Sequence, residues 1–162
     1  MKKAFTMIEL IFVIVVLGIL AGIAVPRLAA TRDDATIAKM RGDLAAIRSG
    51  ISLKRSQNMM RGDTKWPELE TGKYEKDASG NMVFKPDTKQ AGLFAGITQN
   101  PIKDAGQGAR NGWHKTTVFN EYDATVGGKT ARFKYYPTGD SANGILPGTF
   151  RCESGACELF GE

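Results

Sequence analysis

The chain has 162 residues, with 22 Lys or Arg and 17 Asp or Glu, which gives a formal net charge of +5 at pH 7. This length leaves room for one folded domain beyond an apolar segment at the N-terminus. No run of Lys or Arg and no basic stripe interleaved with aromatic residues is present, so the charge indicates a slightly basic surface rather than a domain specialised for nucleic acid.

An apolar run begins the chain. It extends from Phe5 to Pro26, a length of 22 residues, and Glu9 is its only charged member. About 20 apolar residues in a helix span a bilayer, so the run predicts a membrane helix. Two lysines precede it, which by the positive-inside rule leaves the N-terminus in the cytoplasm and the rest of the chain in the periplasm. An ordinary secretory signal, cleaved after the small residues Gly22-Ile23-Ala24, is the alternative, although such a signal has no use for Glu9.

The segment Lys3-Ala-Phe-Thr-Met-Ile-Glu-Leu10 resembles the processing site of type IV prepilins and of the pseudopilins of type II secretion systems. The resemblance covers residues 3–26 and includes Pro26, which matches a helix-bending proline of the family. It implies cleavage between Ala4 and Phe5 by a prepilin peptidase, followed by N-methylation of Phe5. The family usually has Gly before the cut, where this chain has Ala4, which is still a small residue.

The resemblance also implies a fold. A pilin is an α+β protein in which a long, bent N-terminal helix packs against a C-terminal antiparallel sheet. On that basis residues 1–4 are expected to form the leader and 5–30 the membrane and assembly half of the helix. Residues 31–58 are expected to form its amphipathic half, and residues 59–162 a globular head with a variable loop and a sheet.

Glu9 needs a counter-charge if it lies in a membrane, because placing a carboxylate there costs roughly 2.5–3.5 kcal/mol even on the mildest scale. Cleavage would turn the amide nitrogen of Phe5 into a charged α-amine. Glu9 of one subunit could then pair with Phe5 of its neighbour, a head-to-tail contact of the kind that builds open helical filaments. Alternatively, Glu9 reaches the lipid headgroups alone, which its place near the end of the run permits.

The second half of the helix has one apolar face. Its apolar residues are spaced by three and four positions, which is typical of a helix that buries one side, and we expect that side to face the sheet. They are Ile37, Met40, Leu44, Ile47 and Ile51. The pattern predicts a helix that ends near Asn58. In the first half, Gly18 and Gly22 either bring two membrane helices close together or are simply tolerated in lipid.

The head has strand signals mainly in its last third. We predict strands at residues 115–119, 130–136, 148–152 and 157–160, from their β-branched and aromatic content, with a turn at Val126-Gly-Gly-Lys129. Residues 72–86 are rich in turn formers and are expected to be a loop, with a turn at residues 77–81 and either a short strand or an apolar anchor at Met82-Val-Phe84.

Cys152 and Cys157 are the only two cysteines. In a periplasmic protein a pair this close is expected to form a disulfide, which would stabilise a C-terminal hairpin turning at residues 153–156 by about 2 kcal/mol. A metal site is the competing interpretation, but two cysteines with no histidine nearby make a poor one. Type IV pilins often carry a C-terminal disulfide, so the resemblance points the same way.

No catalytic motif is present, and His114 is the only histidine, so the sequence predicts a protein that is not an enzyme. No cofactor is expected. Asp104, Asp123 and Asp140 lie in glycine-containing segments, and some pseudopilins bind calcium in a late loop. None of these segments has the dense oxygen spacing of a calcium loop, so no metal site is assigned.

The predicted function is therefore that of a structural subunit of a type IV pilus or a type II secretion pseudopilus. Its expected partners are further copies of the chain and sister pilins in a filament, the prepilin peptidase, and an assembly platform in the bacterial inner membrane. The chain is expected to cross that membrane once, with the head in the periplasm, and to become a periplasmic or extracellular filament after assembly. A monomeric membrane-anchored binding module and a competence pseudopilin that contacts DNA are the alternatives.

Overall fold

The computed structural model describes residues 6–76, 82–86 and 92–162. The chain divides into two compact units, an N-terminal unit of Met1–Ala35 and a head unit of Thr36–Glu162. Helix α1 (Met7–Met60) contributes residues to both units. Its last residue, Met60, agrees with the predicted end near Asn58. The helix is not interrupted at Pro26, which excludes the local melting that a proline can cause.

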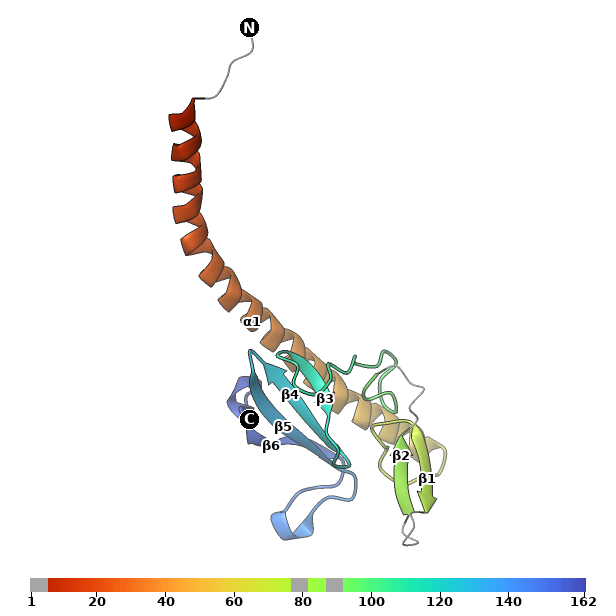
Figure 1. Cartoon of the computed structure of the whole chain (residues 1–162). Helices are drawn as coiled ribbons and strands as arrows, with labels where there is room; N and C mark the ends of the chain where they lie inside the picture. Colours follow the sequence, from red (N-terminus) through yellow and green to blue (C-terminus); the bar gives the residue numbers. More distant parts are fainter. Residues whose placement is uncertain (1–5, 77–81, 87–91) are drawn as a thin grey trace. The chain divides into compact units, whose positions relative to one another are not determined.

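The head unit contains two antiparallel sheets (Figure 1). Strands β1 (Gly72–Lys76) and β2 (Met82–Pro86) form a separate hairpin with Tyr74 opposite Phe84. The main sheet has the order β3-β4-β5-β6 and consists of β3 (Gly112–Lys115), β4 (Glu121–Val126), β5 (Lys129–Tyr136) and β6 (Thr149–Gly155). Two short 3₁₀ helices, η1 (Ser141–Asn143) and η2 (Cys157–Phe160), follow β5 and β6.

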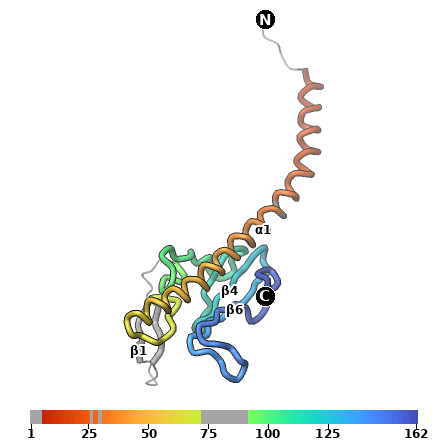
Figure 2. Tube along the Cα trace, turned by 180° about the vertical axis from the view of Figure 1, so that it is seen from behind, coloured from red at the N-terminus to blue at the C-terminus, as the bar shows by residue number. Residues whose placement is uncertain are grey.

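The predicted apolar stripe of α1 is buried in the head unit. Met40, Leu44, Ile47 and Ile51 are almost fully covered, and Ile37 packs at the edge of the same cluster. Figure 2 shows the C-terminal half of α1 running along the sheet. The fold is thus the predicted α+β arrangement of a long N-terminal helix and an antiparallel sheet packed against its second half.

Aromatic rings from every strand of the main sheet fill the space beneath the helix. Alternate residues of β4 and β5 are buried, as the two-residue period of a strand requires. The rings of Phe133 and Phe150 stack with centroids 5.4 Å apart, and Phe94 lies 4.5 Å from Tyr122. Trp113 is fully buried and contacts both pairs, with its ring centroid 5.8 Å from that of Phe94 and 5.2 Å from that of Phe133. One continuous core therefore joins helix, sheet and the loop at Phe94.

The predicted turn at residues 126–129 is confirmed. Gly127 and Gly128 connect β4 to β5 with φ of 59° and 84°. Two successive positive φ values belong to the tight hairpin turn whose twist matches that of the strands, and glycine adopts them without strain. The Gly127 N–H is held by the side-chain oxygen of Asn111 at 2.8 Å, which ties this turn to the segment before β3.

Four of the predicted elements are wrong in whole or in part. Residues 115–119 do not form one strand, because the hydroxyl of Thr116 accepts the Val118 N–H at 3.2 Å and closes a turn between β3 and β4. Residues 157–160 form the 3₁₀ helix η2, and β6 runs on to Gly155 where a turn was expected. The expected loop at residues 72–86 contains β1 and β2, and β2 confirms the short strand that was one of the two interpretations of Met82-Val-Phe84. The turn predicted at residues 77–81 lies outside the described residues.

We expect Ile47→Ala to lower the free energy of unfolding of the full chain in detergent by about 2–5 kcal/mol, because it removes buried methyl groups and leaves a cavity. Leu53→Ala is the matched control, since Leu53 lies on the same helix with 59% of its surface exposed. Denaturant titrations followed by near-ultraviolet circular dichroism measure both values. Equal losses in the two variants would contradict the assignment of the buried face.

Candidate functional site

The N-terminal end of α1 carries the charge that sequence analysis singled out. Glu9 accepts hydrogen bonds from the backbone N–H of Thr6 at 2.9 Å and from its hydroxyl at 2.8 Å. The Thr6 hydroxyl lies 3.4 Å from the backbone nitrogen of Glu9 and accepts its N–H in return. This reciprocal arrangement is a capping box, in which two free N–H groups of the first helical turn gain partners. The carboxylate is therefore fixed at the positive end of the helix dipole.

The capping box escaped the sequence analysis, although Thr6-Met-Ile-Glu9 has the Thr-x-x-Glu spacing that signals it. Ala4 and Phe5, the predicted cleavage residues, lie outside the described residues. Pro26 lies within the helix. The structure thus describes Glu9 and its hydrogen bonds to Thr6, but not the Phe5 nitrogen with which Glu9 was predicted to pair.

An apolar span follows directly. Within the described residues, Met7–Val25 is long and apolar enough to cross a membrane, with a mean hydropathy of 2.9 and no part of it buried. A shallow apolar notch of about 460 Å³ lies beside Glu9 and is lined by Ile8, Phe12 and Val13. A β-carbon added at Gly18 or Gly22 would meet nothing within 4 Å. The single chain therefore leaves this whole surface uncovered.

The predicted disulfide is present. Cys152 and Cys157 are bonded, with 5.8 Å between their α-carbons. Phe160, in the short helix after the bond, is buried against Phe133 at 5.1 Å between ring centroids. The bond therefore closes the turn that returns the C-terminal segment to the core.

Two arginines of α1 also bind this C-terminal segment, through its backbone carbonyls. Arg41 donates to the carbonyl of Leu159 at 2.8 Å, and Arg48 donates to the carbonyl of Phe150 at 2.9 Å. Arg48 also forms an ion pair with Glu162, whose other carboxylate oxygen accepts the Cys152 N–H at 2.7 Å. The contacts of these arginines have no signature in the sequence, because their partners are more than a hundred residues away and each arginine looks like an ordinary exposed charge.

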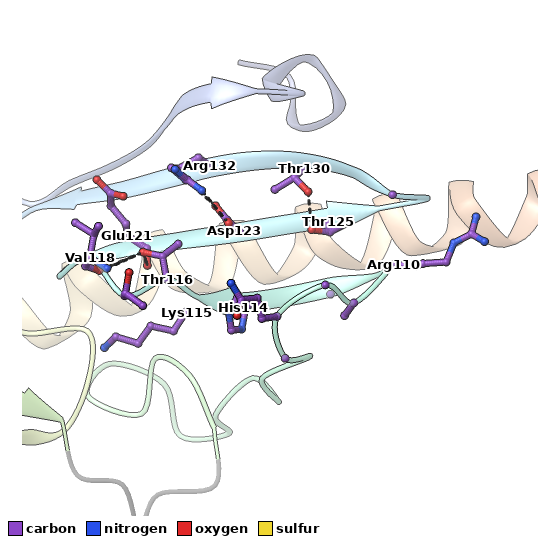
Figure 3. A pocket seen from close by; sticks show the side chains of 17 residues that line it. Arg110, His114, Lys115, Thr116, Val118, Glu121, Asp123, Thr125, Thr130 and Arg132 are labelled. Carbon is purple, nitrogen blue, oxygen red and sulfur yellow. Dashed lines mark hydrogen bonds and ion pairs between the residues drawn. The ribbon is translucent and has the colours of Figure 1, made fainter.

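A polar groove of about 530 Å³ lies on the face of the sheet that points away from α1 (Figure 3). Its floor consists of outward-facing side chains of β3, β4 and β5, and its walls are the loops at residues 106–110 and 116–118. Arg132 donates two hydrogen bonds to Asp123, at 2.8 and 3.1 Å. The hydroxyl oxygens of Thr125 and Thr130 lie 3.0 Å apart and share a hydrogen bond. These side chains satisfy one another across the strands, which is how an exposed sheet face is usually stabilised.

The ionisable groups of the groove do not form a catalytic set. His114 Nδ1 lies 2.9 Å from Asp104, which also accepts the Gly106 N–H at 2.8 Å. Burial lowers the pKa of Lys115, and the nearby Glu70 carboxylate, 3.9 Å away, opposes that shift. The Asp123 carboxylate raises the pKa of Arg132. Among the described residues, no serine or cysteine lines the groove beside a base.

The three aspartates considered for calcium do not come together. Asp104 pairs with His114, Asp123 with Arg132, and Asp140 caps the short helix η1. Among the described residues, no group of three His, Cys, Asp or Glu side chains is placed to hold a metal ion.

Comparison with known proteins gives one family match at the N-terminus and several distant relatives. Residues 1–25 match the family described as the prokaryotic N-terminal methylation motif. The type II secretion system core protein G of Dickeya chrysanthemi is 29% identical over 107 residues, which cover 62% of this chain and 63% of that protein. The type IV major fimbrial protein FimA of Dichelobacter nodosus is 26% identical over 102 residues, which cover 57% of this chain and 61% of that protein.

A third relative, the type IV narrow pilus major component PilA5 of Thermus thermophilus, is 46% identical over 55 residues, which cover 34% of this chain and 47% of that protein. The chain is a distant homologue of the type II secretion pseudopilins and the type IV pilins. Each match spans less than two thirds of the relative's own length. No solved structure matches the chain.

Homology to the pilins bears on two predictions made from the sequence alone. Pilins and pseudopilins are structural proteins, so the prediction of a protein that is not an enzyme is confirmed. The methylation motif and the apolar helix are features of a membrane-anchored pilin.

Replacing both Cys152 and Cys157 by Ala is expected to lower the free energy of unfolding by about 2 kcal/mol, because the short closed loop no longer restricts the unfolded chain. Thermal or denaturant unfolding of the full chain measures the loss, and reduction of the unaltered protein should reproduce it. The head should remain folded, since Arg41, Arg48 and Phe160 still hold the C-terminal segment. Complete unfolding of the variant under native conditions would show that the disulfide, and not these contacts, keeps the head folded.

Proposed function

We propose that the chain is a structural subunit of a type IV pilus or a type II secretion pseudopilus, cleaved between Ala4 and Phe5, N-methylated at Phe5, and assembled into a helical filament. The observation that carries the proposal is the lone carboxylate of Glu9 on an uncovered apolar helix. On this proposal residues 1–4 are the leader, 5–30 the anchoring and assembly half of the helix, 31–58 its amphipathic half, and 59–162 the head.

The charge argument gives cleavage a physical role. Before cleavage the nitrogen of Phe5 is part of an amide, so the membrane segment carries one acid and no base. After cleavage the same nitrogen is a cation, and each subunit has one acid and one base close together in the sequence. Pairing Glu9 with the Phe5 amine of a neighbour joins subunits head to tail, and such contacts propagate into open filaments.

The capping box supports this role for Glu9. Its bonds to Thr6 keep the carboxylate at the first turn of the helix, next to the position where the new terminus would emerge. The carboxylate therefore needs no large side-chain rearrangement to meet an amine there, which reduces the entropy lost on pairing. The apolar notch beside Glu9 offers room for an apolar side chain of the neighbour.

The proposed partners and location follow from the same family. Further copies of the chain and sister pilins would form the filament, a prepilin peptidase would process it, and an inner-membrane platform would assemble it. The N-terminus would lie in the cytoplasm and the head in the periplasm, since Lys2 and Lys3 precede the apolar run. Relatives named for type II secretion and for type IV pili both match the chain, and the proposal therefore includes both machines.

Mass spectrometry of the protein isolated from its native membrane tests the processing step. We expect a mature chain that starts at Phe5 and carries one added methyl group on its terminal amine. An intact Met1 would contradict cleavage, and a start at Val25 would indicate the signal-peptide alternative.

Two substitutions at Glu9 separate its charge from its role as a helix cap. Glu9→Gln keeps an oxygen that accepts the Thr6 N–H but removes the charge, whereas Glu9→Ala removes both. If charge pairing drives assembly, both variants should remain in the membrane as stable subunits and fail to form filaments, because an unpaired buried amine costs about 3–5 kcal/mol.

Electron microscopy and shear fractionation measure the filaments, and membrane immunoblots measure the subunit. Thr6→Ser, which keeps a capping hydroxyl, serves as the control and should assemble normally. Normal filaments from Glu9→Gln would show that the cap rather than the charge matters, and the pairing proposal would then be wrong.

A further inference from the structure

The loop between β5 and β6 presents one exposed leucine. Leu146 has 75% of its surface exposed, whereas the preceding Ile145 is buried. Pro147, which fixes its own backbone φ, follows directly. Single exposed leucines are common on protein surfaces, and this one is a candidate contact because its neighbour Pro147 lines a groove.

Several hydrogen bonds make this loop rigid. Asp140 and Ile145 exchange two backbone hydrogen bonds, each of 2.8 Å, which close the loop at its base. The Asp140 carboxylate accepts the N–H groups of Ala142 and Asn143 at 3.0 and 3.3 Å. The Thr149 hydroxyl donates to the carbonyl of Leu146 itself at 2.6 Å. Leu146 is therefore held in place before any partner arrives.

A groove of about 690 Å³ lies next to this leucine in the head unit, and Pro147 forms part of its wall. We call it the proline–aromatic groove, since prolines and aromatic rings supply most of its apolar surface. Its lining residues are Asn58, Asp63, Lys65, Trp66, Pro67, Glu68, Phe119, Pro137, Thr138 and Pro147.

The walls of the proline–aromatic groove are fixed as firmly as the leucine. A β-carbon at Gly148 would lie only 2.2 Å from the Trp66 ring, so the ring packs directly on that glycine. The Arg55 guanidinium lies over Trp66 at 5.0 Å, and the buried carbonyl of Pro67 accepts the hydroxyl of Tyr135 at 2.8 Å. Because both the projection and the hollow are preformed, their contact would lose little conformational entropy.

We propose that this surface binds a second copy of the same chain, with Leu146 of each copy inserted into the proline–aromatic groove of the other. The groove calls for an apolar occupant that projects from its parent surface, and the chain itself supplies one. Since Leu146 directly precedes a wall residue of the groove, the two features lie on one surface that is complementary to itself. A two-fold contact between identical surfaces can therefore form both insertions at once.

The charges at the groove support a contact between copies. Asp63 and Glu68 are acidic and Lys65 is basic, so both signs are present around the same opening. When two such surfaces meet about a two-fold axis, an acid of one copy can lie near the base of the other. A groove of single sign would instead repel its own copy.

The contact is small, so a single pair of heads would associate weakly. In a filament the same surface repeats along the length, and many weak contacts then act together. The consequence for filaments, which rests on the proposed function, is that neighbouring filaments associate laterally through Leu146 and the proline–aromatic groove.

Cross-linking of the full chain in detergent tests the contact without requiring filaments. One preparation carries Leu146→Cys and another Thr138→Cys, which lies in the groove, and a short bismaleimide joins free thiols while the Cys152–Cys157 disulfide stays unreactive. We expect mixed dimers from this pair and only background from Leu146→Cys mixed with Lys129→Cys, at the exposed turn between β4 and β5. Equal yields from both mixtures would overturn the proposal.

A complementation experiment tests the mutual insertion in filaments. Leu146→Ser removes the projection and Thr138→Trp fills the groove, so filaments of either variant should lose lateral association in low-speed sedimentation. Losing the burial of one leucine should raise the filament concentration required for lateral association by about tenfold. A mixture of the two variants should regain association, since each supplies the half that the other lacks.

Ala142→Ser, in the same loop but not in the groove, is the control and should sediment like the unaltered protein. Unchanged sedimentation of Leu146→Ser, or a mixture that stays dispersed, would overturn the mutual insertion. If the unaltered chain forms no filaments at all, the proposed function fails, whereas the cross-linking result still decides whether the head contact exists.

Discussion

The buried stripe of α1 and the aromatic face of the sheet cover one another, and neither is shielded from water without the other. Ile47 is completely buried, and it lies in one cluster with Trp113 and Phe133 of the sheet. Burying apolar surface is the main favourable term in folding, so this contact decides whether the head exists as a folded unit. The disulfide, the two arginine contacts and the hairpin turns add to a core that is already closed.

The periodic parts of this fold were predictable from the sequence. The spacing of Met40, Leu44, Ile47 and Ile51 gave the buried face of the helix, because a 3.6-residue period persists whatever packs against it. The two glycines between β4 and β5 gave the turn, because few other residues adopt their backbone angles. The resemblance to pilins was also predictable, because one acid interrupts an otherwise apolar N-terminal run, and the family match covers that same segment.

The parts that could not be predicted depend on single long-range or side-chain contacts. Thr116 and Val118 have the composition of a strand, yet one hydroxyl bond turns the chain at that point. The contacts of Arg41 and Arg48 with the C-terminal segment have no local signature, since they join residues more than a hundred positions apart. The short helix after the disulfide likewise follows from where the chain must return and not from its β propensity.

The cap at the start of α1 bears on how readily a filament comes apart again. One carboxylate oxygen of Glu9, Oε2, already has two donors in the isolated chain, the backbone N–H and the hydroxyl of Thr6. A neighbour's amine would therefore meet a carboxylate that is already partly satisfied, and the net gain per joint would be the difference between a partly satisfied state and a fully paired one. Small differences of this kind favour reversible polymers, in which an inserted subunit can be withdrawn to the bilayer and used again.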